Sequence, residues 1–158
     1  MLLKRLASGL YVPPLLGFSR RRCCCGETPL CSNCLTADPD NIQVILAGIA
    51  TPLADCAGLN GTYSVPSLAP AQPCAWIDDF TIAFIVYRIR VLVQFFIPTG
   101  THRIIVSITG NTPIRSVSWQ RYFGASKIDC AGFSDTDIPF QSASNCAGSS
   151  STCKITAL

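Results

Sequence analysis

Apolar and polar residues alternate along most of the chain beyond residue 40, the period of β-strands that bury one face. In the first such segment, residues 42–50, one side carries Ile42, Val44, Leu46 and Gly48 and the other carries Gln43, Ile45 and Ala47. The segment stops at Pro52, which cannot donate to a sheet hydrogen bond. This pattern predicts a first core strand.

Runs of β-branched and aromatic residues bounded by Pro, Gly and Asn predict the other strands. The longest apolar run, residues 80–97, predicts two strands, at about 79–87 and 89–97, with Arg88 and Arg90 near a bend or on an exposed edge. The remaining predicted strands are residues 62–65, 102–109, 114–122, 138–141 and 152–157. The Pro- and Ala-rich residues 67–73 predict a surface loop, which is a common place for binding contacts.

Seven or eight short strands without an amphipathic helix predict an all-β fold, an antiparallel β-sandwich or a jelly-roll-like domain. We assign this domain to residues 41–158, a length that can bury a hydrophobic core. Residues 23–40 form a cysteine-rich knot, and residues 1–22 form an extended N-terminal arm. The chain is therefore expected to hold one compact domain with an appendage.

The composition favours burial in an assembly. Charged residues make up 13% of the chain and apolar residues 49%, against a usual charged share of roughly a quarter. Residues 1–22 carry five basic side chains and no acid, whereas residues 23–158 carry seven basic and nine acidic ones, a formal net charge of −2. A basic arm is thus joined to a slightly acidic body.

The arm resembles a secretory signal poorly, because its apolar run is broken by Pro13 and Pro14 and three arginines stand where a cleavage site belongs. We expect it to dock on a neighbouring subunit; the alternative is an arm folded over its own domain. The residues assigned to this docking are Leu10, Tyr11, Leu15, Leu16, Arg20, Arg21 and Arg22. Three arginines without a binding fold do not predict a nucleic-acid partner. No run of about 20 apolar residues predicts a membrane span.

Five cysteines lie within residues 23–34, and two chemistries fit them. A Cys-x-x-Cys pair with two further thiolates can hold Zn²⁺ tetrahedrally. The candidate ligands are Cys23, Cys25, Cys31 and Cys34, with Cys24 as a substitute. Disulfides are the favoured interpretation, because five further cysteines follow in a disulfide-like arrangement. Apart from this possible zinc, no cofactor is expected.

The later cysteines are Cys56, Cys74, Cys130, Cys146 and Cys153, all candidates for disulfides. Two Asp-Cys-Ala-Gly runs, at residues 55–58 and 129–132, each open a segment that closes on another cysteine. Local pairing predicts a bridge from Cys56 to Cys74 and one from Cys130 to Cys146 or Cys153, although spacing alone does not fix connectivity. Such bridges would place the protein in an oxidising setting.

Catalytic patterns are scarce, so no enzymatic activity is expected. The single histidine, His102, has no nucleophile motif beside it and is expected to be a solvent-facing structural residue. The acidic pairs Asp78-Asp79 and Asp135 with Asp137 can in principle bind Ca²⁺ or hydrolyse glycosides, but turn residues are the simpler interpretation. A sugar-stacking platform would use four aromatic residues: Trp76, Trp119, Tyr63 and Tyr122.

Residues 31–158 resemble cysteine-rich β-sandwich modules found in uncharacterised proteins of tailed bacteriophages and some environmental bacteria. The resemblance rests on Cys-x-x-Cys, the strand ending in Gly48, Cys56-x-x-Leu59-Asn60-Gly61-Thr62-Tyr63, Cys74-x-Trp76, and Asp129-Cys130 followed by Cys146 and Cys153. It implies a structural role, as a capsid decoration or tail component of a virion or as an extracellular surface module. The expected partners are copies of this chain and neighbouring structural proteins. The alternative is a secreted module that binds glycan or another surface ligand through Trp76, Tyr63 and residues 66–73.

Overall fold

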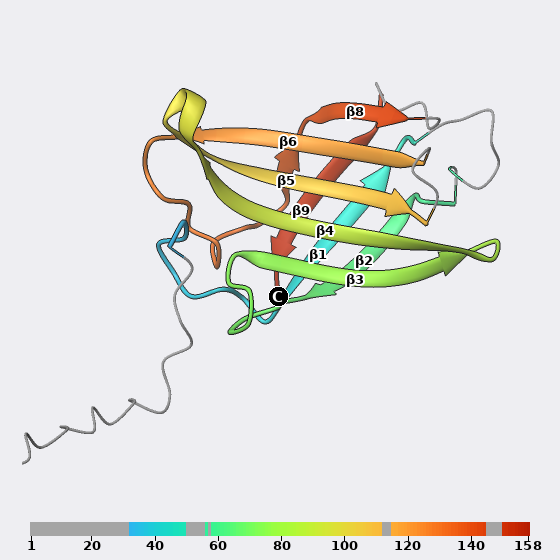
Figure 1. Cartoon of the computed structure of the whole chain (residues 1–158), viewed down its shortest axis with the longest axis horizontal. Coiled ribbons are helices and arrows are strands. Elements are labelled where there is room, and N and C mark those ends of the chain that lie inside the picture. Colours follow the sequence, from blue (N-terminus) through green and yellow to red (C-terminus); the bar gives the residue numbers. More distant parts are fainter. Residues whose placement is uncertain (1–31, 50–55, 57, 112–114, 145–149) are drawn as a thin grey trace, which may run out of the picture.

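The computed structural model describes residues 32–49, 56, 58–111, 115–144 and 150–158, and it confirms an antiparallel β-sandwich (Figure 1). One sheet has four strands in the order β2-β1-β9-β7, and the other has five in the order β3-β4-β5-β6-β8. The strands are β1 (Asn41–Ala47), β2 (Gly61–Pro66), β3 (Ala75–Ile82), β4 (Ile85–Phe96), β5 (Thr101–Gly110), β6 (Ser116–Gly124), β7 (Thr136–Ile138), β8 (Phe140–Ser144) and β9 (Thr152–Ala157), with a 3₁₀ turn η1 (Ile97–Thr99). The predicted arm, residues 1–22, lies outside the described residues.

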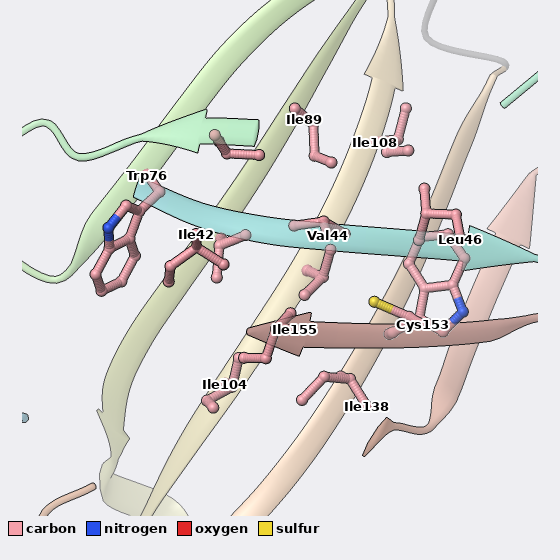
Figure 2. Close-up of a cluster of buried hydrophobic side chains, with 14 of the residues drawn as sticks. Ile42, Val44, Leu46, Trp76, Ile89, Ile104, Ile108, Ile138, Cys153 and Ile155 are labelled. Atoms are coloured by element: carbon pink, nitrogen blue, oxygen red, sulfur yellow. The ribbon is translucent and has the colours of Figure 1, made fainter. Parts of the chain in front are cut away.

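The core lies between the two sheets and follows the predicted alternation. Ile42, Val44 and Leu46 of β1 are almost fully buried. Figure 2 shows them beside apolar side chains from both sheets, among them Ile108 of β5 and Ile155 of β9. Strands β1, β4 and β5 thus turn alternate residues inward, which is the physical basis of the two-residue period.

The structure corrects the prediction for residues 80–97. The turn lies at Ala83 and Phe84, where φ is +47° and +66°, and Ile82 pairs with Ile85 across it. Arg88 therefore lies inside a 12-residue strand, β4, rather than near a bend. The sequence hides this turn because two-residue hairpins with two positive φ angles normally carry Asn or Gly.

Residues 32–40 pack on the sandwich instead of standing apart from it. The Pro39 carbonyl accepts a hydrogen bond from the Trp76 Nε1–H at 2.8 Å, and the Asp38 carboxylate accepts one from the Cys74 N–H at 2.7 Å. Burial raises the pKa of Asp38 more than this hydrogen bond lowers it. In the described part of the chain no helix is long and apolar enough to cross a membrane.

A disulfide joins Cys34 to Cys130, with their Cα atoms 5.6 Å apart across 96 residues of sequence. The predicted pairing of Cys130 with Cys146 or Cys153 is therefore wrong. Cys34 is also unavailable as a zinc thiolate; the other proposed ligands, Cys23, Cys24, Cys25 and Cys31, lie outside the described residues, as does Cys146. Sequence spacing favoured local pairs, whereas the fold brings residue 34 beside the loop that follows β6.

Cys153 is a free thiol buried in the core, so its prediction as a disulfide cysteine is also wrong. It occupies an inward position of β9, two residues from Ile155. Burial, with a smaller contribution from Asp137, raises the pKa of its thiol well above the usual range. Cys153 therefore acts as a small apolar core residue.

Cys56 and Cys74 each take part in a disulfide, but not with each other. Cys56 forms a turn with Leu59 just before β2 begins, whereas Cys74 lies beyond the end of β2, beside Ala75 and its partner Leu68. The six residues of β2 hold its two ends about 20 Å apart, with Cys56 near one end and Cys74 near the other. A disulfide requires the Cα atoms of its cysteines to lie within about 7 Å. The predicted bridge between them is therefore wrong.

Candidate interaction site

A groove of about 580 Å³ opens at one end of the sandwich, between Leu35 and the loop that follows β6. We call it the end groove. Its apolar lining comes from Leu35, Phe123, Ile128 and Phe133, and Lys127 and Asp129 add charge. The segment after residue 32 and the loop between β6 and β7 lie side by side at the left of Figure 1.

Backbone pairing and the disulfide hold the two walls of the end groove together. The Leu35 N–H donates to the Ile128 carbonyl at 2.7 Å, and the Ile128 N–H donates to the Asn33 carbonyl at 3.1 Å. The Cys34–Cys130 bond closes the same contact covalently. By the chain-entropy model, a disulfide across about 100 residues contributes about 4–5 kcal/mol to stability. The groove is therefore a fixed feature of this end.

The second Asp-Cys-Ala-Gly run builds the turn that carries Cys130. The Asp129 Oδ1 atom accepts hydrogen bonds from the Thr36 hydroxyl at 2.9 Å and from the Gly132 N–H at 3.1 Å. A Cβ at residue 132 would collide with the Asp129 carboxylate, so a side chain there would force this carboxylate out of its present position. In the first run the Leu59 N–H donates to the Cys56 carbonyl, again forming a tight turn at a disulfide cysteine. The repeated motif therefore positions cysteines.

Apolar surface continues beyond the end groove. Strand pairing places Phe95, His102 and Gly124 in one row across β4, β5 and β6, and Gly124 lines the groove. The Phe95 side chain is 45% exposed and Ile97 of η1 is 82% exposed, while Leu35 at the groove is 63% exposed. This end of the sandwich thus carries a broad apolar surface.

Acidic and basic side chains beside the end groove are equal in number. The Arg121 guanidinium lies 5.1 Å from the centre of the Phe123 ring, which lines the groove. With Lys127 and Lys154 it stands against three carboxylates, those of Asp129, Asp135 and Asp137, and all six side chains are exposed. Lys154 lies 4.0 Å from the Asp137 carboxylate. Because these charges are solvated, they contribute little to the stability of the fold.

The predicted catalytic residues do not converge. His102 is 6% exposed with its ring 5.0 Å from that of Phe95, so the expectation of a solvent-facing histidine is wrong. Asp79 pairs with Arg88, and Arg88 lies opposite Thr109 near one end of β5. His102 lies near the other end of β5, so Asp79 and His102 are far apart. The Arg88 guanidinium, which donates to both Asp79 oxygens, lowers the pKa of this carboxyl. Asp78 and Asp135 are exposed.

The predicted aromatic platform does not form either. Trp76 and Trp119 are fully buried, and their indole N–H groups bond to the Pro39 carbonyl and the Ser151 hydroxyl. Tyr63 is half-buried and donates to the Leu59 carbonyl at 2.7 Å. Tyr122 alone is well exposed. Trp76 therefore does not present its ring to a ligand, and binding of a glycan through Tyr63 and residues 66–73 stays a prediction.

Within the described residues, no three His, Cys, Asp or Glu side chains lie close enough together to hold a metal ion. Scans of protein-family models, curated proteins and solved structures each found no match to this chain. The end groove is therefore the feature from which we argue function.

Sequence reasoning missed the end groove because its lining comes from distant parts of the chain. Leu35 stands in the cysteine-rich segment, whereas Phe123 and Phe133 flank the loop after β6. One signal was present: Phe133 directly follows the second Asp-Cys-Ala-Gly run, as Leu59 follows the first. Both residues are buried, which explains the apolar position in the motif.

Proposed function

We propose that this protein is an accessory structural subunit of a virion, and that its end groove receives the N-terminal arm of a neighbouring copy. The observation that carries this proposal is the apolar end groove, which the described residues leave uncovered and fix in place with the Cys34–Cys130 disulfide. An uncovered apolar surface of this kind marks a binding site.

The arm has the chemistry that the end groove calls for. Leu10, Tyr11, Leu15 and Leu16 supply apolar side chains, and the basic residues of the arm can pair with the exposed carboxylates of Asp129 and Asp135. Fifteen residues separate Leu16 from Ser32, enough to span about 50 Å when extended. The arm can therefore reach a groove on another subunit.

A neighbouring copy fits better than the chain's own arm. The apolar surface runs from the end groove to Phe95 and Ile97, which is more than one short segment covers. Contact with a second subunit would bury this wider surface together with the arm. Such a contact joins two different surfaces, so a pair of subunits keeps one free arm and one free groove, and the assembly can extend or close into a ring.

The virion setting is supported by other features. The chain is poorly charged, which suits permanent burial. Its residues 31–158 resemble modules of tailed-phage proteins, and its disulfides suit a particle that meets an oxidising environment. Purified particles containing this protein in stoichiometric amount with other structural proteins would agree with the proposal. Recovery of the chain alone, shortened to near Cys23, would contradict it.

Sedimentation velocity of the full chain and three variants tests the contact itself. We expect the full chain to self-associate at micromolar concentration, and both deletion of residues 1–22 and the Leu35→Asp variant to remain monomeric. Leu35→Asp places a charge on an exposed groove wall, so it should leave the fold intact. Phe84→Asp is the matched control, because Phe84 is fully exposed at the opposite end of the sandwich.

Retained self-association in Leu35→Asp, or equal loss in Phe84→Asp, would contradict docking at the end groove. Circular dichroism of each variant separates loss of contact from loss of fold. If the variant without residues 1–22 still associates like the full chain, the arm does not form the contact between subunits.

A further inference from the structure

The five-stranded sheet has one face on the core and one outer face, and the outer face carries unusual charge. Its residues alternate with the buried ones of β4 and β5, so Arg88, Arg90 and Arg103 all point away from the core. The strand pairing places Asp79 beside Arg88, and it is the one acidic residue among the outward positions of this sheet that the structure describes. The outer face therefore has an excess of positive charge.

Arg88 is neutralised, but Arg90 and Arg103 are not. The Arg88 Nε and Nη2 atoms donate to the two Asp79 oxygens at 2.7 and 2.8 Å. Neither Arg90 nor Arg103 has a carboxylate partner in the described part of the chain. The Arg90 Nε atom is buried with no hydrogen-bond partner there. These two guanidinium groups retain their charge for an external anion.

Neutral groups hold the Arg103 side chain in place. Its Nη1 donates to the Gln120 Oε1 at 3.3 Å, and its Nη2 and Nε lie 2.7 and 2.9 Å from the Gln94 amide oxygen when that amide faces them. Its guanidinium carbon lies 4.1 Å from the centre of the Phe96 ring. Arginine has five N–H donors, so about two stay free for a planar anion such as a carboxylate.

An exposed aromatic ring stands beside this arginine. Tyr122 pairs with Arg103 across β5 and β6, is 49% exposed, and lies 6.0 Å from Phe96 between ring centres. Outward Ser107 and Ser118 continue the face as a row of hydroxyl groups, which can exchange hydrogen bonds with a polyhydroxyl ligand. Arginine, an aromatic ring and hydroxyl groups are the chemistry that recognises an acidic sugar.

We propose that the outer face of the five-stranded sheet binds an anionic glycan. Arg103 binds a carboxylate or sulfate group of the glycan, and Tyr122 packs against the sugar ring. Arg90 binds a second anionic group farther along the glycan. Arg90 lies four residues along β4 from Gln94, the partner of Arg103, which is about 13 Å. Self-pairing of this face is disfavoured because it would bring arginine against arginine. Two free cations favour a glycan over nucleic acid, which needs many phosphate contacts.

Binding of the full chain to immobilised polysaccharides tests this inference. We expect retention on polygalacturonate or dextran sulfate, little retention on neutral dextran, and a loss of about tenfold or more in affinity for Arg103→Gln. Arg90→Gln should weaken binding independently. Tyr122→Phe should bind normally, whereas Tyr122→Leu should not. Lys154→Gln removes the same charge from the other sheet and is the matched control.

Equal weakening in Lys154→Gln and Arg103→Gln would mean general charge attraction and would overturn the proposal. Normal binding in Arg103→Gln, or equal retention on neutral dextran, would also overturn it. Tighter binding to a single-stranded oligonucleotide than to either polysaccharide, lost in Arg103→Gln, would reassign the face to nucleic acid. Thermal unfolding confirms that each variant folds. These outcomes are independent of arm docking, because the deletion of residues 1–22 should still bind.

Discussion

Single residues in this protein are determined by close contacts that a linear pattern does not reveal. At Gly132, the Asp129 carboxylate occupies the space where a side chain would lie, so glycine lets that carboxylate keep its hydrogen bonds. Asp38 accepts a backbone hydrogen bond with one oxygen, while its other oxygen is buried without a partner among the described residues. Both residues serve the segment that joins residues 32–40 to the sandwich.

Asp38 provides a prediction for pH dependence. Burial raises its pKa in the folded protein, so the folded state binds this proton more tightly than the unfolded state. Its contribution to stability is therefore fully present below the unfolded pKa, about 4, and falls as the pH rises through the folded value. Asp38→Asn should raise the free energy of unfolding at pH 7 by less than about 1 kcal/mol, since the group is partly solvated.

Urea unfolding at pH 7 and pH 3 measures this effect. The gain should disappear at pH 3, where the carboxyl is neutral in both states. Asp40→Asn, which alters an exposed carboxylate two residues away, should give no comparable gain. Lower stability of Asp38→Asn at pH 7 would show that the ionised group stabilises the fold.

At the scale of elements, the β3–β4 hairpin departs from the residues that its turn prefers. Ala83 and Phe84 both have positive φ, which costs roughly 1 kcal/mol or more for a residue with a side chain. Phe84 is fully exposed, so its ring contributes nothing to the core. Replacing the pair with Asn-Gly should raise the free energy of unfolding by about 1 kcal/mol.

Equilibrium unfolding in urea tests the hairpin. Ala125→Gly, at an exposed loop residue without positive φ, should give no gain and serves as the control. Unchanged or reduced stability with Asn-Gly would mean that this turn is not strained.

The elements that sequence predicted well are those whose apolar residues alternate. Residues 42–46 and 152–157 alternate clearly, and they form β1 and β9. The hairpin at residues 83–84 was misplaced because its residues give no turn signal. Disulfide pairing and the end groove depend on which distant segments meet, and residue 34 meets residue 130 only through the folded sandwich. Local patterns therefore predicted the fold class, whereas the candidate site required three-dimensional structure.

At the scale of the whole molecule, the sandwich separates two surfaces of different chemistry. The end groove is apolar and suits the apolar side chains of the arm. The outer face of the five-stranded sheet carries two arginines that have no carboxylate partner among the described residues, and it suits an anionic ligand. A subunit could therefore hold its neighbours at one end while a sheet face stays accessible.

Photo-crosslinking from position 35 tests the central claim most directly. A photoreactive residue in place of Leu35, on full chains mixed half ¹⁵N-labelled and half unlabelled, should form crosslinks to peptides from residues 1–22. Mass spectrometry should find crosslinks that join a ¹⁵N-labelled peptide to an unlabelled one, because such crosslinks can form only between two copies of the chain. Crosslinks to the arm within single copies only, or none to residues 1–22, would contradict docking between subunits.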